Sequence, residues 1–86
     1  MYYVYVLQSE KDRRFYVGYT LELRNRLKLH NEGRVESTKD RRPLQLVYYE
    51  ACINQRDVLH RERYLKTAYG KRYIKNRLRI YLDSYK

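Results

Sequence analysis

Glu62 is a carboxylate on the apolar side of a predicted helix. Asn54 is a suitable cap for this helix, which we expect to continue to Tyr69, just before a glycine. Val58 and Leu65 fall on the same side as Glu62, about one helical turn before it and one after it. A buried ionised group without a partner costs several kcal/mol, so Glu62 must either pair with a Lys or Arg or bind a metal cation.

Arg26 and His30 lie one helical turn apart in the segment 21–32. We predict that this segment is a helix, which Thr20 caps and Gly33 ends. Both side chains border an apolar stripe formed with Leu23 and Leu27. Two interpretations of Arg26 remain open at this point: its stem covers the stripe while its head reaches water, or its charge serves a site, with Glu62 as a candidate partner.

Tyrosines dominate the two short apolar runs at the start of the chain. The runs Tyr3–Leu7 and Phe15–Tyr19 are separated by the charged stretch Glu10–Arg14, which predicts a β-hairpin with a turn longer than two residues. A phenol can pack through its ring and still present a titratable hydroxyl, as in Tyr5 and Tyr16. The alternative is that these rings are ordinary strand residues.

The rest of the chain alternates a loop, a strand and a helix. Residues 34–42 mix hydroxyls with cations and have no periodicity, so we expect an exposed loop that can contact phosphate oxygens. Pro43 then opens a third strand, 43–50, with Leu44, Leu46 and Tyr48 on one face. After Gly70, the segment 71–82 predicts a last helix with an inner face made by Tyr73, Ile74, Leu78 and Tyr81.

The composition predicts a single domain that binds a polyanion. The 86 residues carry 20 Lys and Arg against 10 Asp and Glu, which gives a net charge of +10 and a pI near 9.9. Nucleic acid is the first candidate and an anionic membrane the second, although no stretch is apolar enough to span a bilayer and none resembles a signal segment. The lone Cys52 excludes an internal disulfide and a Cys-rich zinc site, and it fits the cytoplasm.

Five features of the chain, taken in order, resemble the signature of the GIY-YIG nucleases. They are Tyr3-Val4-Tyr5, Tyr16-Val17-Gly18, Arg26 with His30, Arg61–Lys66 with its central Glu62, and Gly70–Asn76. The chain is similar to compact stand-alone members that are related to the nuclease domain of the excision-repair enzyme UvrC. It departs from the pattern at Tyr3, which replaces the first glycine, and at Tyr19, which replaces a lysine of UvrC-like members. Arg14 or Lys39 could supply that missing cation.

The resemblance implies an α/β domain over residues 1–86 that hydrolyses phosphodiester bonds. The expected fold is a small, mainly antiparallel three-stranded sheet flanked by helices, in the order strand, strand, helix, strand, helix, helix. Glu62 would hold one Mg²⁺ or Mn²⁺, and Arg26 would bind the non-bridging oxygens. Tyr5 or Tyr16 would orient or deprotonate the water, with cations lowering the phenol's pKa. His30 would have a supporting role.

The expected partner is DNA or RNA, bound through phosphate and without a membrane. With no groove-reading element in the matched pattern, binding should be salt-sensitive and sequence-tolerant, with any repair or recombination target chosen by substrate shape or by a partner protein. Two alternatives remain: a nucleic-acid-binding module with an inactive site, and a protein-interaction domain with a tyrosine-rich surface. The residues expected to contact nucleic acid are Arg14, Ser37, Thr38, Lys39, Lys66, Lys71 and Asn76.

Overall fold

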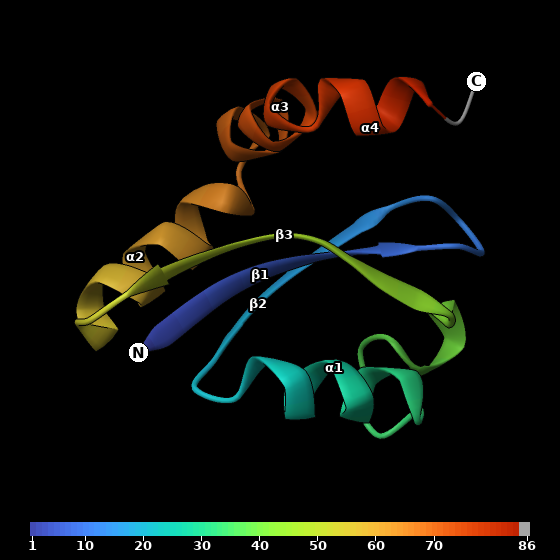
Figure 1. Ribbon diagram of the computed structural model, residues 1–86, viewed down its shortest axis with the longest axis horizontal. Coiled ribbons are helices and arrows are strands. Elements are labelled where there is room, and N and C mark those ends of the chain that lie inside the picture. The colour runs from blue at the N-terminus through green and yellow to red at the C-terminus, as the bar shows by residue number, and fades with distance from the viewer. Residues whose placement is uncertain (85–86) are drawn as a thin grey trace.

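A three-stranded antiparallel sheet with helices on both faces forms the structure, a computed structural model that describes residues 1–84 (Figure 1). The strand order is β2-β1-β3, which places the first strand at the centre. Helix α1 covers one face, and α2, α3 and α4 lie towards the other (Figure 1). The predicted fold class and element order are confirmed. The elements are β1 (Tyr2–Ser9), β2 (Phe15–Thr20), α1 (Leu23–Asn31), the 3-10 helix η1 (Lys39–Arg41), β3 (Leu44–Cys52), α2 (Gln55–Leu65), α3 (Ala68–Arg77) and α4 (Arg79–Asp83).

The central strand β1 divides the core into two clusters, because its successive side chains point to opposite faces of the sheet. Tyr5 and Leu7 point towards α1, and Val4 and Val6 point towards α2 and α3. Leu23 and Leu27 of α1 complete the first cluster, together with Tyr16, Leu44 and Leu46. The second cluster contains Val17, Val58, Leu65 and Ile74. None of the helices among residues 1–84 is both long and apolar enough to cross a bilayer.

The predicted hairpin is confirmed, with β1 paired to β2 through residues 3–8 and 15–20. Ser9 organises the turn: its hydroxyl oxygen accepts hydrogen bonds from the backbone N–H groups of Lys11 and Asp12. Arg13 has a φ of 63°, in the left-handed region, so the chain reverses without the Asn-Gly pair that a two-residue turn uses. This turn places Arg14 immediately before β2.

Strand β3 carries an irregularity that the sequence analysis did not predict. Its pairing with β1 skips one residue, since Val6 faces Tyr48 and Leu7 faces Leu46. Leu46 therefore packs with the α1 cluster, whereas Tyr48 packs on the α2 side. The prediction that Leu44, Leu46 and Tyr48 share one face is wrong, because a bulge reverses the alternation after it.

Helix α1 starts later than predicted. The Thr20 hydroxyl accepts from the backbone N–H of Glu22, so it forms a turn ahead of the helix, which begins at Leu23. The expected stop is confirmed: Gly33 has a φ of +78°, and its N–H bonds the carbonyl of His30. The loop after it is not fully exposed, since Val35 is 8% and Thr38 is 0% exposed.

The helix predicted to reach Tyr69 ends at Leu65, and α3 starts three residues later. Thr67 causes the break: its side chain accepts from the N–H of Gly70 and donates to the carbonyl of Tyr64. Gly70 is not the end of a helix but lies in the first turn of α3, where a Cβ would overlap the Tyr64 carbonyl oxygen and the Leu65 backbone. The glycine is therefore needed for close approach of α3 to α2. The segment predicted as one last helix is divided between α3 and α4.

Candidate active site

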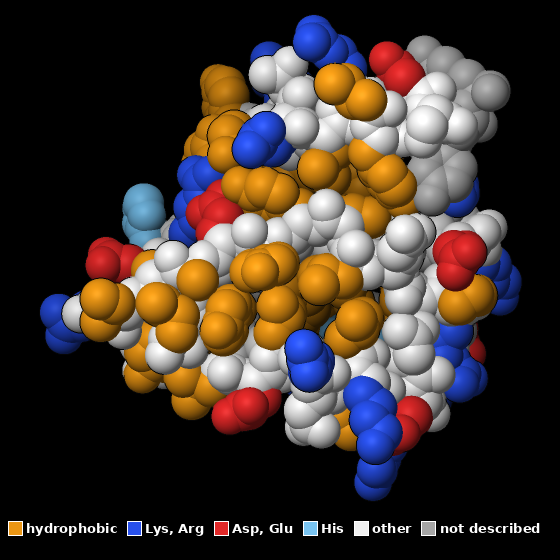
Figure 2. Space-filling model, in the orientation of Figure 1, with side chains coloured by type: hydrophobic (Ala, Val, Ile, Leu, Met, Phe, Trp, Pro, Cys, Tyr) orange, Lys and Arg blue, Asp and Glu red, His pale blue; other side chains and the backbone are white. Residues whose placement is uncertain are grey.

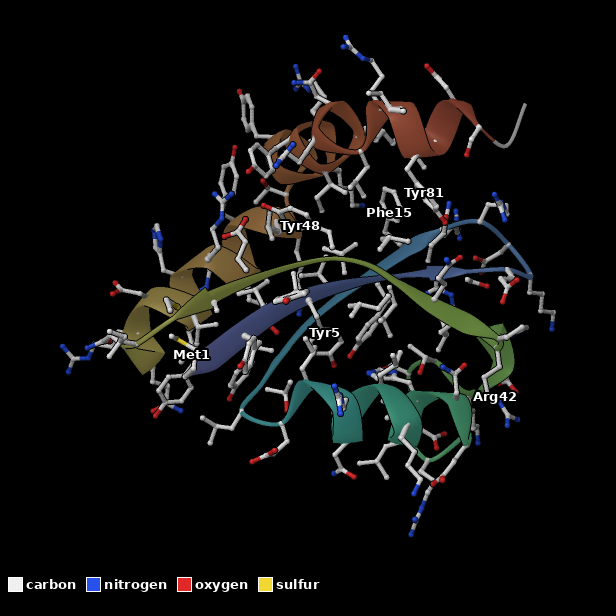
Figure 3. The ribbon with its side chains drawn as sticks, in the orientation of Figure 1. Met1, Tyr5, Phe15, Arg42, Tyr48 and Tyr81 are labelled. Atoms are coloured by element: carbon white, nitrogen blue, oxygen red, sulfur yellow. The ribbon has the colours of Figure 1, made fainter. Side chains whose placement is uncertain are left out.

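The hydroxyl of Tyr5 is the centre of a polar cluster between the sheet and α1. Tyr5 points from β1 towards α1 (Figure 3), and only 1% of the residue is exposed. Its oxygen lies 2.9 Å from Nε2 of His30 and accepts a hydrogen bond of 3.4 Å from Nε of Arg26. Gly18 faces it across the strands, and a Cβ there would approach the Tyr5 hydroxyl oxygen to 2.5 Å. The glycine of the Tyr16-Val17-Gly18 motif thus makes room for this phenol.

His30 joins Tyr5 to a second hydroxyl, that of Thr38. Its Nδ1 lies 2.7 Å from Oγ1 of Thr38, and both residues are 0% exposed. Burial, aided by the charge of Arg26, lowers the pKa of His30 to about 4, so the imidazole is neutral at pH 7. A neutral imidazole donates through one nitrogen and accepts through the other, so it holds both hydroxyls in place.

Tyr16 packs beside this chain of hydrogen bonds. Its ring centroid is 5.1 Å from that of His30 and 6.4 Å from that of Tyr5. Its hydroxyl accepts a hydrogen bond of 3.4 Å from Ser37, in the loop after α1. Tyr5, Tyr16, Arg26 and His30, which were predicted from three separate segments, are therefore brought together by the structure.

Glu62 lies on α2 and forms no hydrogen bond with Tyr5, Arg26 or His30 within residues 1–84. Its carboxylate is 3.5 Å from Nζ of Lys66, and its side chain is 18% exposed. The sequence left two options for Glu62, a salt bridge or a bound cation. Within residues 1–84, Glu62 forms a salt bridge with Lys66 and not with Arg26. The charge of Glu62 nevertheless acts on Tyr5, because it contributes to raising the pKa of that phenol.

Burial is the main cause of the raised pKa of Tyr5, and the hydrogen bond from Arg26 offsets only part of it. We predicted that a metal, Arg26 and nearby Lys could lower the pKa of the phenol; Arg26 does act in that direction, but in the protein by itself burial outweighs it. The phenol is almost completely removed from water, which disfavours its anionic form. Tyr5 is therefore a neutral hydrogen-bonding group at pH 7.

Any metal at this site would depend on one carboxylate. Among the described residues, no three His, Cys, Asp or Glu side chains are grouped closely enough to hold an ion. A half-buried carboxylate with a solvent-exposed lysine beside it fits a Mg²⁺ that keeps several waters and takes further ligands from phosphate. Glu62 fits such an ion, whereas a cage made only of protein ligands is absent from residues 1–84.

The residues expected to contact nucleic acid are spread over several surfaces. Ser37 is exposed beside Tyr16, and Lys66 is exposed beside Glu62. Lys39 pairs with Glu36 at 3.2 Å. Thr38 is a correction: it is buried against His30, so its hydroxyl positions the imidazole and cannot reach a phosphate. The remaining three, Arg14 on the hairpin turn and Lys71 and Asn76 on α3, are exposed.

Two contacts that hold the helices on β3 were not predicted from the sequence. Asn31 closes the end of α1 onto β3, since its side chain both donates to the carbonyl and accepts from the N–H of Leu44. Arg61 forms two hydrogen bonds of 2.8 and 2.9 Å to the carboxylate of Glu50 on β3. A signal for the second was present, because Glu50 follows Tyr48 at strand spacing and so shares its face.

The chain matches the family model described as the GIY-YIG catalytic domain over residues 1–81. The chain belongs to the GIY-YIG family. The resemblance inferred from the motifs is thereby confirmed, and the matched model is described as a catalytic domain. In this GIY-YIG domain, the motif residues Tyr5, Tyr16 and Arg26 are the ones that converge with His30.

Several curated relatives of this GIY-YIG domain carry the name UPF0213 protein. The one from Pediococcus pentosaceus is 45% identical over 62 residues, which cover 71% of this chain and 64% of the relative. One from Clostridium perfringens is 43% identical over 77% of this chain and 71% of its own length, and one from Pediococcus acidilactici is 38% identical over 87% and 82%. This GIY-YIG domain thus spans less than two thirds of the first of these proteins. No solved structure matches it.

Proposed function

We propose that the protein is an endonuclease that uses a divalent metal ion to hydrolyse phosphodiester bonds of DNA. The observation that carries this proposal is Arg26, whose guanidinium is held on the Tyr5 hydroxyl and forms no ion pair within residues 1–84. A half-buried cation without an opposite charge, held beside the Tyr5 hydroxyl, attracts an anion. The resemblance to the GIY-YIG nucleases implies that this anion is a phosphodiester.

The residues divide the tasks of hydrolysis. Arg26 binds the non-bridging phosphate oxygens through its planar fork and stabilises their charge as it grows. Tyr5 orients the attacking water, because its hydroxyl is fixed by His30 on one side and by Arg26 on the other. Tyr16 borders the same space, with Ser37 holding its hydroxyl. Tyr5 is the better candidate for the water-orienting group, since it alone contacts both His30 and Arg26.

Glu62 is the residue that would hold Mg²⁺ or Mn²⁺. A bound divalent ion supplies positive charge for the phosphate and lowers the pKa of a bound water. For Glu62 to act in this way, its carboxylate must exchange Lys66 for the ion, which is easy because that lysine is 55% exposed at its side chain.

The test is cleavage of plasmid, single-stranded and branched DNA by the purified protein, with Mn²⁺ and with EDTA. We expect nicking or cutting that requires Mn²⁺ and is weakened by salt. Binding without cleavage in every metal would show a nucleic-acid-binding module with an inactive site. Absence of both binding and cleavage would leave the tyrosine-rich surface as a protein-interaction site. Any repair or recombination role depends on which of the three substrates is preferred.

A further inference from the structure

A basic cleft lies between the β1–β2 turn and α3, apart from the tyrosine cluster. It has a volume of about 730 Å³ and includes Phe15 and Leu82 in its walls. Phe15 and Tyr81 lie between the sheet and the α3–α4 layer (Figure 3). The charged residues of the cleft are five cations and one acid: Arg13, Arg14, Arg41, Lys71 and Lys75 against Asp12.

The acid of the cleft is already used by the protein. The Asp12 carboxylate accepts hydrogen bonds from Nε of Arg41 at 3.0 Å and from the backbone N–H of Arg14 at 2.9 Å. These contacts lower the pKa of Asp12 to about 2, so it stays ionised and remains paired with Arg41. Among the other cations of the cleft, Arg14, Lys71 and Lys75 form no ion pair within residues 1–84.

Lys71 and Lys75 face the cleft together from α3. They are four residues apart on one helix, so their like charges repel each other, and both side chains are exposed. No carboxylate among residues 1–84 forms a salt bridge with either lysine. A helix keeps two adjacent cations at a small cost in stability, and an anion bound between the lysines and Arg14 would relieve that repulsion.

The cleft and the tyrosine cluster lie on opposite faces of the sheet and share β2, which is an edge strand. Phe15 is in the wall of the cleft, and the next residue, Tyr16, belongs to the cluster on the other face. The Arg41 guanidinium of the cleft donates to the backbone carbonyl of Phe15 on this edge strand. A nucleic acid that passes around the β2 edge can therefore reach both the cluster and the cleft.

The face shown in Figure 2 has a different character. Hydrophobic side chains gather along β3 and between β3 and the α3–α4 layer, and most Lys and Arg lie at the rim of this view. Tyr49 of β3 is 53% exposed, and Ile53, just after the end of β3, is 84% exposed. A polyanion has little to bind at the centre of that face, which favours the cleft beside β2.

We propose that this cleft binds backbone phosphates of the nucleic acid that the active site cleaves, away from the scissile bond and around the β2 edge of the sheet. The proposal rests on the proposed nuclease function, because it assigns the path of the same substrate. The cleft suits a chain of phosphates better than a single anion: its cations come from the hairpin turn, from η1 and from α3, and its long side chains are mostly exposed rather than closed around one point. Contacts of this kind carry no base specificity.

The test removes the two lysines of α3 and compares the variant with a matched control. Lys71→Ala/Lys75→Ala loses two cations of the cleft, whereas Lys28→Ala/Arg56→Ala loses two exposed cations of α1 and α2. The start of α2 lies at the opposite end of the sheet from the β1–β2 turn (Figure 1). Alanine favours helices, so both variants should fold, which circular dichroism verifies.

Binding is measured by fluorescence anisotropy in EDTA, on a labelled duplex, from low to high salt. Each phosphate contact contributes about 0.9 to the log-log salt slope, so the slope of the cleft variant should fall by about 2, and that of the control should match the parent. In Mn²⁺, the parent should cleave a full-length duplex faster than the cleft variant does. On a substrate shortened on the side of the cut that reaches the cleft, the two proteins should cleave at the same rate. Equal slopes for the two variants would overturn the proposal even if the parent cleaves DNA.

The remaining outcomes separate this proposal from the nuclease function. A reduced slope in a protein that never cleaves would support the cleft and reject the nuclease. Inorganic phosphate at millimolar concentration should not compete with the duplex. Competition by free phosphate that is lost in the cleft variant would show a small-anion site and overturn the proposal of a strand path.

Discussion

Two clusters of tyrosines lie on opposite sides of the sheet, and they differ in whether their arginine is paired with a carboxylate. On the α1 side, Tyr5 bonds a neutral imidazole and an arginine that lacks a carboxylate partner within residues 1–84. On the α2 side, Tyr48 donates to the Glu50 carboxylate at 2.8 Å. The same carboxylate accepts hydrogen bonds from Nε and Nη2 of Arg61. Figure 3 shows the two labelled tyrosines, Tyr5 and Tyr48, on either side of the sheet.

The α2 cluster is closed. The Arg61 guanidinium also stacks on the ring of Tyr73, 4.8 Å from its centroid, and on that of Tyr64 at 5.1 Å. Burial by itself would raise the pKa of Glu50, but the bonds from Arg61 and Tyr48 outweigh it and lower that pKa. The pKa of Tyr48 is raised by burial and by its hydrogen bonds. The charges of Arg61 and Glu50 neutralise each other, so this cluster stabilises the packing of β3 on α2.

The difference teaches where to look for function among similar residues. Both clusters contain tyrosines and an arginine, and composition does not separate them. Within residues 1–84, the α1 cluster leaves the half-buried Arg26 without an opposite charge, and such an imbalance is typical of a binding or catalytic site. The predictions below test this contrast, beginning with the largest expected effect.

Glu62→Gln should abolish metal-dependent cleavage, because the amide cannot replace a carboxylate as a ligand for Mg²⁺ or Mn²⁺. Stability should change by no more than about 1 kcal/mol, since the pair lost with Lys66 is partly exposed. Plasmid nicking and urea unfolding of the same preparations measure both. Unchanged nicking would remove the proposed metal ligand, and unfolding would make Glu62 a structural residue.

Arg26→Ala should reduce turnover about 10²-fold to 10³-fold, because its proposed partner is charge that develops in the transition state. Affinity for DNA should fall much less, since other cations contact the backbone. Single-turnover cleavage and anisotropy separate the two effects. A large loss of affinity with unchanged turnover would make Arg26 an ordinary phosphate contact.

The stability of the protein should fall as the pH is lowered from about 6.5 to about 4, because of His30. The folded protein holds the pKa of this residue at about 4, against 6.5 when unfolded, so the unfolded chain binds more protons in this window. The full loss is on the order of 3 kcal/mol, measured by urea unfolding. His30→Gln should flatten the dependence. The loss of stability caused by protonation of Asp12 occurs at lower pH, between 3.8 and about 2, so the two effects are separable.

Arg61→Ala should cost about 2 kcal/mol of stability, because it leaves the half-buried Glu50 carboxylate without its charged donor. Nicking by the folded fraction should match the parent, since Arg61 belongs to the closed cluster. Thermal unfolding followed by an activity assay well below the transition measures both. A loss of activity in a fully folded variant would mean that the two clusters are not functionally distinct.

Local pattern in the sequence was sufficient for most of the site. Alternation predicted the hairpin that presents Tyr5 and Tyr16, and helical spacing placed Arg26 and His30 on one side of α1. These periodicities follow from backbone geometry, which is the same wherever the segment lies in the fold. The same rule failed at Tyr48, because a bulge is set by pairing between strands and not by the strand itself.

Only the tertiary structure decided which polar groups meet. Thr38 appears in the sequence as one hydroxyl of a basic loop, but the loop folds back and buries it on His30. Glu62 pairs with Lys66, the residue that follows α2, and Arg61 rather than Arg26 binds the carboxylate of Glu50, on a strand 11 residues earlier. The partner of a polar side chain depends on how far both groups are removed from water and on the distance between their helices or strands. Both are determined only when the sheet and its helices pack together.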